Sequence, residues 1–294
     1  MLSCARDKWL FDRFVAQAAL GIISFLKVDL FHLFDRCHNG LAAIREEWET
    51  AGTAEDQECM KYVLDQPAGS STTQFANGLR DQGRNGEFLR DFVDKPESKV
   101  AELNIAHVAA LRLYTTHCFH SINNPLRDVS SQAPHPFPVT VFFLTDAIKR
   151  LRAVHAESKR DGDQKRGSKE GQPMLNLWRG MRNLKTGATF HLEGGSELAP
   201  MSTTSNLAVA VAYGQSADTL LFKIICKNFM MCGADISYLS CFTNEKEYLF
   251  PPLTYLSPTG RPPETVRVQV HDDQSTGSKG KTLKFNVLEV EPVM

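Results

Sequence analysis

The sequence lacks the cysteine patterns that stabilise small secreted domains or hold structural zinc. Its 294 residues include seven cysteines, an odd number, and none of them form a C-x-x-C pair. It also contains no Asn-x-Ser/Thr acceptor for glycosylation, and its first residues do not follow the pattern of a cleavable leader. These absences argue against a disulfide framework and a secretory route. We therefore expect a reducing, cytoplasmic setting.

The sequence also has little excess charge and no long hydrophobic run. Lys and Arg number 33 against 34 Asp and Glu, which gives a net charge of −1. This balance gives no reason to expect nucleic acid or an anionic membrane as a partner. The most apolar run, from Phe14 to Leu26, is shorter than the roughly 20 residues that cross a bilayer. We expect a soluble globular chain with no membrane span.

Two nucleotide-binding motifs and a metal site are also missing. No G-x-G-x-x-G occurs, and the P-loop-like end Gly280-Lys281-Thr282 has Ser275 where the first glycine is required. His117, Cys118 and His120 offer two imidazoles and one thiol without a matching second pair. Because a structural zinc ion requires four ligands, we expect these three residues to belong to a packed helix and predict no metal.

Helical periodicity dominates the first half of the chain. Apolar residues recur at helical spacing in four segments, about Lys8–Glu49, Asp56–Leu64, Lys99–Ile122 and Val139–Val154. Pro125 is expected to stop the third segment, because a residue before proline is biased away from the helical region. A charged, apolar-poor loop is expected after these helices, from Glu157 to Gly171.

Strand-like runs dominate the second half. They are Met174–Trp178, Thr189–Leu192, Leu220–Cys226, Glu247–Phe250, Thr265–Val270 and Leu283–Val290. The last two alternate well and flank a polar loop, His271–Thr282, which predicts an antiparallel hairpin with a long tip. Helices followed by strands predict an α+β fold, not alternating βαβ units.

Three short segments in this half carry side chains suited to chemistry. Arg179-Gly180 is expected at the end of a strand, and Ser202-Thr203-Thr204 is expected to end another strand before a short helix, Leu207 to Tyr213. Glu245-Lys246-Glu247 leads into a strand that Pro251 cuts short. If the strand includes Glu245, alternation places the two carboxylates on one face, where each raises the pKa of the other.

Taken singly, these residues have ordinary explanations. A lone arginine is most often a surface charge, and a serine beside a helix start is commonly only a cap. Trp178 and Tyr213 are more often core residues than ligand contacts. The order Arg179, Ser202, Glu247 together with the flanking residues is more specific than any one of them.

This ordered set resembles the Arg-Ser-Glu class of mono-ADP-ribosyltransferases, which includes clostridial binary-toxin enzymes and vertebrate ecto-transferases. Ser202-Thr203-Thr204 is similar to the family's S-T-S, with Thr204 where serine is usual, and Glu245 to Pro251 is similar to its E-x-E-φ-L-x-P strand. Tyr114-Thr115, with Ile122-Asn123 and Leu126-Arg127, is similar to the helical segment that opens the family's catalytic domain. The likeness covers about 99–294. It implies a catalytic domain, 96–294, with a split β-sandwich around a cleft. Residues 1–95 lie outside the likeness, and their helical periodicity predicts a helical N-terminal region.

The resemblance also implies roles for these residues. NAD is the expected substrate, and no metal is expected. The NAD-binding residues implied are Arg179, Gly180, Ser202, Thr203 and Thr204. Glu247 would stabilise the positive charge that develops on the ribose, with Ser202 orienting it. Glu245 would engage and deprotonate the acceptor, and Phe242 is a candidate for contacting it.

The implied activity is transfer of ADP-ribose to an arginine of an acceptor protein with release of nicotinamide. Two alternatives remain open. Water could accept the ADP-ribose, which would make the protein an NAD glycohydrolase, and the same three residues would serve that reaction. The chain could also bind NAD or a protein without turnover, although the presence of Arg179, Ser202 and Glu247 argues against a degenerate site.

Overall fold

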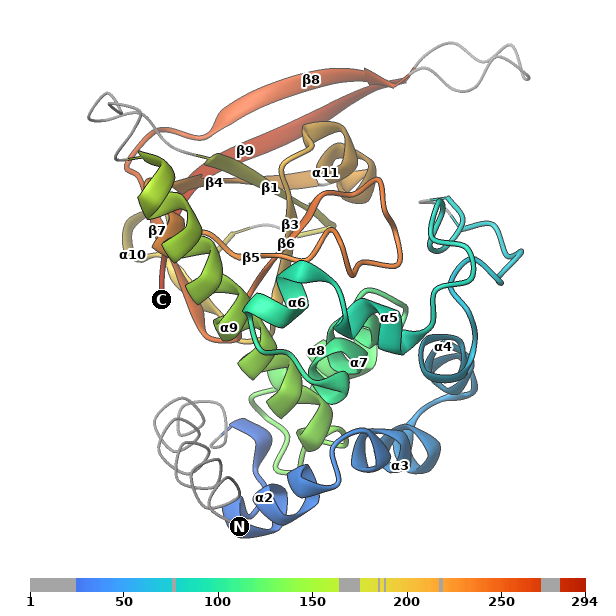
Figure 1. Cartoon of the computed structure of the whole chain (residues 1–294). Helices are drawn as coiled ribbons and strands as arrows, with labels where there is room; N and C mark the ends of the chain where they lie inside the picture. Colours follow the sequence, from blue (N-terminus) through green and yellow to red (C-terminus); the bar gives the residue numbers. More distant parts are fainter. Residues whose placement is uncertain are drawn as a thin grey trace.

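The computed structural model describes residues 25–75, 78–163, 175–184, 186–187, 189–216, 219–270 and 281–294. Most helices gather at one end of the molecule and the strands at the other, and the long helix α9 (Pro138–Asp163) runs from one region to the other (Figure 1). The fold is α+β, as predicted. Among these residues, no helix is both long enough and apolar enough to cross a lipid bilayer.

The helical region is built from short helices. They are α2 (Leu30–His38), α3 (Leu41–Ala51), α4 (Ala54–Asp65), α5 (Leu89–Val93), α6 (Pro96–Val100), α7 (Ile105–Tyr114) and α8 (Phe119–Arg127). Of the first expected helix, residues before 25 lie outside the described part, and Gly40, at a φ of 49°, separates α2 from α3. Helix α9 continues to Asp163, so the first residues of the expected loop from Glu157 are helical, and the rest of that loop, 164–171, lies outside the described residues.

The helix expected over Lys99–Ile122 is wrong, because this segment contains three helices. Asn104 begins α7 by accepting bonds from the backbone N–H groups of Ala106 and His107. The hydroxyls of Thr115 and Thr116 donate back to carbonyls in the last turn, which ends α7. The helix end expected at Pro125 is also wrong, because Pro125 lies inside α8.

Within the described residues, the sheet has nine strands in the order β2-β7-β9-β4-β1-β3-β6-β5, with β8 paired to β9. Their bounds are β1 (Leu175–Arg182), β2 (Gly195–Glu197), β3 (Met201–Thr204), β4 (Thr219–Cys226), β5 (Ala234–Asp235), β6 (Glu247–Phe250), β7 (Thr254–Pro258), β8 (Glu264–Val270) and β9 (Lys281–Val293). All pairs are antiparallel except β4 with β9. The predicted hairpin is β8–β9. Most of its tip, 271–280, lies outside the described residues.

Two sequence-based expectations in this region are wrong. The strand expected at Thr189–Leu192 is a helical turn, α10 (Phe190–Glu193), followed by Gly194 at a φ of 75°. Arg179 lies in the interior of β1 and not at its end. The helix expected from Leu207 is confirmed as α11 (Leu207–Gly214), which Asn206 caps.

The sheet is nearly divided between β1 and β3. Their described residues are registered at a single pair, Trp178 with Thr204. The strands β2, β7, β9, β4 and β1 therefore form one part of the sheet, and β3, β6 and β5 form the other. Arg179 of β1 and the residues of β3 and β6 consequently lie at the boundary between the two parts.

Helices before and after residue 95 share one hydrophobic core. The buried side chains of Trp48, Phe92, Leu111 and Leu249 all belong to it. Trp48 stacks on the ring of Phe137 at 3.9 Å between centroids. This shared core means that the α2–α5 helices pack on the rest of the chain, while a domain boundary at residue 95 stays a prediction.

Candidate active site

Ser202 connects the other two members of the ordered set. Its hydroxyl donates a 2.6 Å hydrogen bond to Glu247 Oε1, and its carbonyl oxygen accepts a 2.9 Å bond from Arg179 Nη1. The sheet order explains this arrangement, because β1, β3 and β6 are consecutive strands. The three residues that the sequence separates by up to 68 positions (247 − 179) thus form one connected group.

Arg179 is a largely buried cation whose hydrogen bonds are incomplete. Its side chain is 17% exposed, and its Nη2 lies 3.7 Å from Glu197 Oε2. Burial lowers the pKa of Arg179, and its Nε atom is buried without a hydrogen-bond partner. An unpaired buried donor on a guanidinium is costly, so an oxyanion that accepts from Nε would stabilise the site.

A second arginine lies on the same carboxylate. Arg127, at the end of α8, donates from Nε and Nη2 to the two oxygens of Glu197 at 2.9 and 3.1 Å. Glu197 thus holds the guanidinium groups of Arg127 and Arg179 near each other. Two fixed cations beside one carboxylate leave a net positive region, which favours a ligand with negative charge.

Glu247 is buried and held by two hydroxyls. The residue is 5% exposed, and this burial raises the pKa of its carboxyl, while hydrogen bonds from Ser202 and Ser240 act in the opposite direction. Two donors to one oxygen pair fix the orientation of the carboxylate and favour its charged form. Such a group can stabilise a positive charge that develops in front of it.

Glu245 does not share a strand face with Glu247, contrary to the sequence-based expectation. It lies in the turn before β6, and Lys246 between the two carboxylates has a φ of 44°, which turns the chain. Glu245 Oε1 accepts a 2.6 Å bond from Tyr213 Oη. Burial and the nearby charge of Glu247 raise the pKa of Glu245 to about 7, and the Tyr213 bond opposes them. The charge of Glu247 thus raises the pKa of Glu245, as expected, although the geometry differs, whereas the pKa of Glu247 is raised by burial.

The remaining NAD-binding candidates, Gly180, Thr203 and Thr204, hold neighbouring elements of the site together. A Cβ atom on Gly180 would lie 1.9 Å from the carbonyl oxygen of Ala210, so glycine lets α11 approach β1. The hydroxyl of Thr203 donates to the carbonyl of Tyr248 at 2.8 Å, and that of Thr204 donates to the carbonyl of Glu245. These bonds attach β3 to β6 and to the turn that carries Glu245.

Phe242 lies in the same loop, three residues before Glu245. Its ring meets the edge of Phe75 at 5.8 Å between centroids, and it is half-buried. A partly exposed aromatic ring can contact the apolar and cationic parts of a long basic side chain. Contact between Phe242 and the acceptor stays a prediction.

Sequence reasoning did not assign functions to four residues of this site, namely Arg127, Glu197, Tyr213 and Ser240. Arg127 was available in the opening helical motif, whose Tyr114 donates to the carbonyl of Pro200 at 2.7 Å just before β3. Tyr213 was available as the last aromatic residue of α11. Glu197 and Ser240 had no signal, because the pairing of the short strand β2 with β7 and the path of the loop before β6 depend on tertiary contacts.

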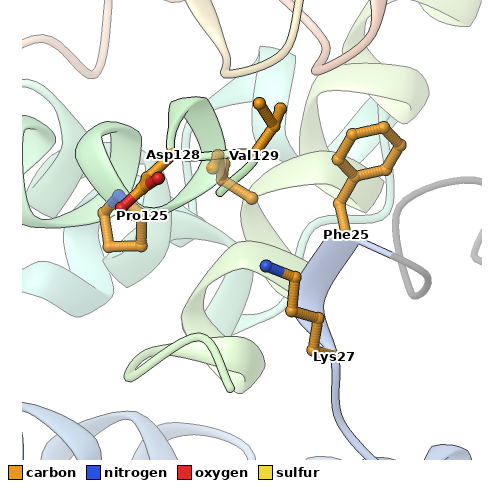
Figure 2. Close-up of a pocket in the computed structure, with 6 residues that line it drawn as sticks. Phe25, Lys27, Pro125, Asp128 and Val129 are labelled. Atoms are coloured by element: carbon orange, nitrogen blue, oxygen red, sulfur yellow. The ribbon is translucent and has the colours of Figure 1, made fainter. Parts of the chain in front are cut away.

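A separate pocket of about 190 Å³ lies at the end of α8 (Figure 2). It is lined by Phe25, Lys27, Pro125, Leu126, Asp128 and Val129. None of the Arg179, Ser202 or Glu247 side chains contributes to it. In the described part of the chain, no three or more His, Cys, Asp or Glu side chains are grouped to hold a metal ion, and His117 instead lies 3.2 Å from Glu55.

Comparison with known proteins decides the family. Residues 94–278 match the family described as NAD:arginine ADP-ribosyltransferase, abbreviated ART. The chain belongs to this family. The match confirms the resemblance drawn from Arg179, Ser202 and Glu247, and the α+β fold is that of the ART enzymes. Membership makes the chain an NAD-dependent ADP-ribosyltransferase in class, and no curated protein sequence matches it.

Solved structures similar to this chain include bacterial ADP-ribosyltransferases. Exoenzyme S of Pseudomonas aeruginosa, solved with human 14-3-3 protein beta and carba-NAD, is 20% identical with a TM-score of 0.40, covering 68% of this chain and 86% of its own. HopU1 of Pseudomonas syringae is 16% identical with a TM-score of 0.43, covering 81% and 97%. The type III effector XopAI of Xanthomonas axonopodis is 13% identical with a TM-score of 0.47, covering 90% and 96%.

Proposed function

We propose that this ART transfers ADP-ribose from NAD to an arginine side chain of an acceptor protein and releases nicotinamide. The observation that carries the proposal is the pair of carboxyls before and in β6. Glu247 is fixed by Ser202 at 2.6 Å, and Glu245, two residues earlier, is held by Tyr213 in the turn outside the strand. One carboxylate can therefore face the ribose while the other faces the group that attacks it.

The two arginines suit the diphosphate of NAD. Arg179 has a buried Nε without a partner, and Arg127 presents a half-exposed guanidinium beside it on Glu197. A planar guanidinium fork forms paired hydrogen bonds with phosphate oxygens, which fixes the ligand's position as well as its charge. Gly180, Thr203 and Thr204 shape the adjoining wall by letting α11, β3 and β6 approach one another.

Glu247 is placed to assist cleavage of the bond between the ribose and nicotinamide. When this bond breaks, its electron pair leaves with the nicotinamide nitrogen, and positive charge builds on the ribose carbon and ring oxygen. A carboxylate fixed by the hydroxyls of Ser202 and Ser240 needs no reorientation as this charge develops. It would also hold a ribose hydroxyl and thereby orient the sugar.

Glu245 is placed to select and activate the acceptor. A guanidinium nitrogen that attacks the ribose carbon forms the new carbon–nitrogen bond and must lose a proton. Glu245, whose pKa is raised to about 7, would hold the guanidinium by charge-assisted hydrogen bonds and receive that proton. Phe242 in the same loop would contact the apolar stem of the acceptor side chain.

The test uses NAD labelled in its adenylate half. The protein is incubated with this NAD and with poly-arginine, with poly-lysine of equal length, or with no polymer, and both polymer label and free nicotinamide are measured. Label on poly-arginine alone is expected. Nicotinamide release without label on either polymer would support the glycohydrolase, and no release under any condition would support a chain that binds without turnover.

A further inference from the structure

The loop before β6, residues 236–245, is fastened by a segment that precedes the family match. The match begins at residue 94, whereas Asp81 and Arg84 lie before it. The backbone N–H of Asp81 donates to the carbonyl of Cys241 at 2.7 Å. The carbonyls of Ser237 and Ser240 accept bonds from Arg84 at 2.6 and 2.5 Å. A side chain outside the family region therefore holds the loop at two points.

The loop carbonyl between these points is also bound by an arginine. Arg112 of α7 donates from Nη1 to the carbonyl of Leu239 at 2.9 Å. The same guanidinium forms two bonds with the carboxylate of Asp81, at 3.1 and 2.8 Å, and stacks on the ring of Phe92. Arg112 and Asp81 are 2% and 0% exposed, so this ion pair is fixed inside the protein. It sets the position of the segment that carries Arg84.

The fastened loop controls three features of the site. Ser240, whose carbonyl Arg84 binds, hydrogen-bonds Glu247 through its hydroxyl. Phe242 follows two residues later, and Glu245 follows Phe242. The hydroxyl of Thr243 also donates to the carbonyl of Gln82 at 3.3 Å, so the segment contacts the loop on both sides of Phe242.

We infer that Arg84, anchored by Asp81, is a positioning residue that holds the 236–245 loop in the conformation that receives the acceptor arginine. This inference rests on the proposed function. A loop with a single fixed conformation lowers the conformational cost of binding the acceptor. Release of the loop weakens binding of the acceptor most. It disturbs the orientation of the Glu247 carboxylate less, through the hydrogen bond from Ser240. The N-terminal helical region is thus part of the acceptor site.

Arg84 is a better target for the test than Asp81. Removal of Asp81 leaves the buried Arg112 without its counter-charge, which threatens folding itself. Loss of the Arg84 side chain, which is 13% exposed, leaves Asp81 still paired with Arg112, so no buried charge loses its only partner. Arg152 of α9 supplies a matched control, because it also donates to two carbonyls of one loop, Cys232 at 3.0 Å and Met230 at 2.6 Å.

The experiment compares Arg84→Ala and Arg84→Lys with Arg152→Ala in the full chain. Loss of charge-assisted bonds to the loop should lower kcat/KM for poly-arginine about tenfold or more in Arg84→Ala. The KM for NAD should stay unchanged, and nicotinamide release without acceptor should fall only a few-fold. Arg84→Lys should recover part of the loss. Hydrogen exchange across 236–245 should accelerate in Arg84→Ala and remain at the wild-type rate in Arg152→Ala.

If hydrogen exchange in the 236–245 loop is the same in Arg84→Ala as in the wild type, the inference is overturned, whatever the acceptor is. Faster exchange with equal losses of transfer and nicotinamide release overturns the positioning role as well. If the wild type leaves poly-arginine unlabelled, the proposed acceptor is wrong, and the inference is then judged on the remaining readouts. In that case Arg84→Ala must still accelerate loop exchange and slow nicotinamide release more than Arg152→Ala does, and failure of either result overturns it.

Discussion

Tyr213 and Glu245 are joined by a 2.6 Å hydrogen bond from the phenol to the carboxylate. The bond links the last turn of α11 to the turn before β6, across a sequence separation of 32 residues. Burial and the charge of Glu247 raise the pKa of Glu245 to about 7, and the phenol limits that rise. The pKa of Glu245 is thereby kept near 7, so that at neutral pH its carboxyl can both accept and release a proton.

The raised pKa of Glu245 predicts the pH dependence of transfer. A carboxyl with a pKa of about 7 is protonated below that pH and cannot accept the acceptor's proton. The kcat/KM for poly-arginine should therefore rise by about tenfold per pH unit below pH 7 and level off above it. Initial rates of label transfer between pH 5.5 and 9 measure this profile.

Tyr213→Phe sharpens the same test. Removal of the phenol removes the interaction that lowers the pKa of Glu245, so the rise in rate should move to higher pH. Tyr255→Phe is the control, because the Tyr255 phenol donates to the carbonyl of Glu193 and not to Glu245. A midpoint that stays in place in Tyr213→Phe would contradict the assignment of the titration to Glu245.

Replacing each carboxylate by its amide should distinguish the roles of Glu245 and Glu247. Glu245→Gln should remove most transfer to poly-arginine while leaving much of the slow NAD hydrolysis, because water needs no carboxylate clamp. Glu247→Gln should abolish both, since removing a fixed charge at the reacting centre costs several kcal/mol. Parallel measurements of polymer label and nicotinamide release decide this, and normal nicotinamide release by Glu247→Gln would refute its proposed role.

Arg179→Lys should weaken NAD binding with little loss of stability. Lysine keeps the charge but lacks the planar fork and the Nε donor that Arg179 leaves unpaired. We expect the Kd for NAD to rise roughly tenfold, which is the value of one lost charge-assisted bond. Titration calorimetry gives the affinity. Arg261→Lys, which changes an exposed arginine near Glu289, serves as control, and equal affinities for both variants would exclude a phosphate-binding role.

Gly180→Ala should disturb the contact between α11 and β1. The added methyl group would meet the Ala210 carbonyl at 1.9 Å, so the helix must shift or the strand must bend. Overpacking of this kind costs about 1–3 kcal/mol, and it should lower both the melting temperature and the affinity for NAD. Gly187→Ala is the matched control, because no atom lies within 4 Å of the added carbon.

The sequence predicted the strand that carries Glu247 with its observed bounds. Pro251 and Pro252 cannot continue the ladder, and the apolar residues before them have a regular pattern, so local chemistry determines β6. The cap of α11 and the β8–β9 hairpin were predictable for similar local reasons. In each case the signal lies within a few neighbouring residues.

The errors arose where tertiary contacts override local preference. Lys246 takes a positive φ that its side chain does not favour, and this turns Glu245 away from the strand face that it was expected to share with Glu247. The hydroxyls of Thr115 and Thr116 ended α7 in a segment whose periodicity indicated a longer helix. The contact of Arg84 with the loop spans 156 residues, and no local pattern announces such a pair.

Strand β9 has a consequence for how the protein is made. It is formed by residues 281–293, yet it lies between β7 and β4 and pairs with both. A ribosome that has synthesised only residues before 281 has therefore produced a chain whose sheet lacks its connecting strand. The shared helical core can form earlier, but β2 and β7 can join the strands of the active site only after β9 has emerged. Catalytic competence should therefore appear only after β9 has left the exit tunnel.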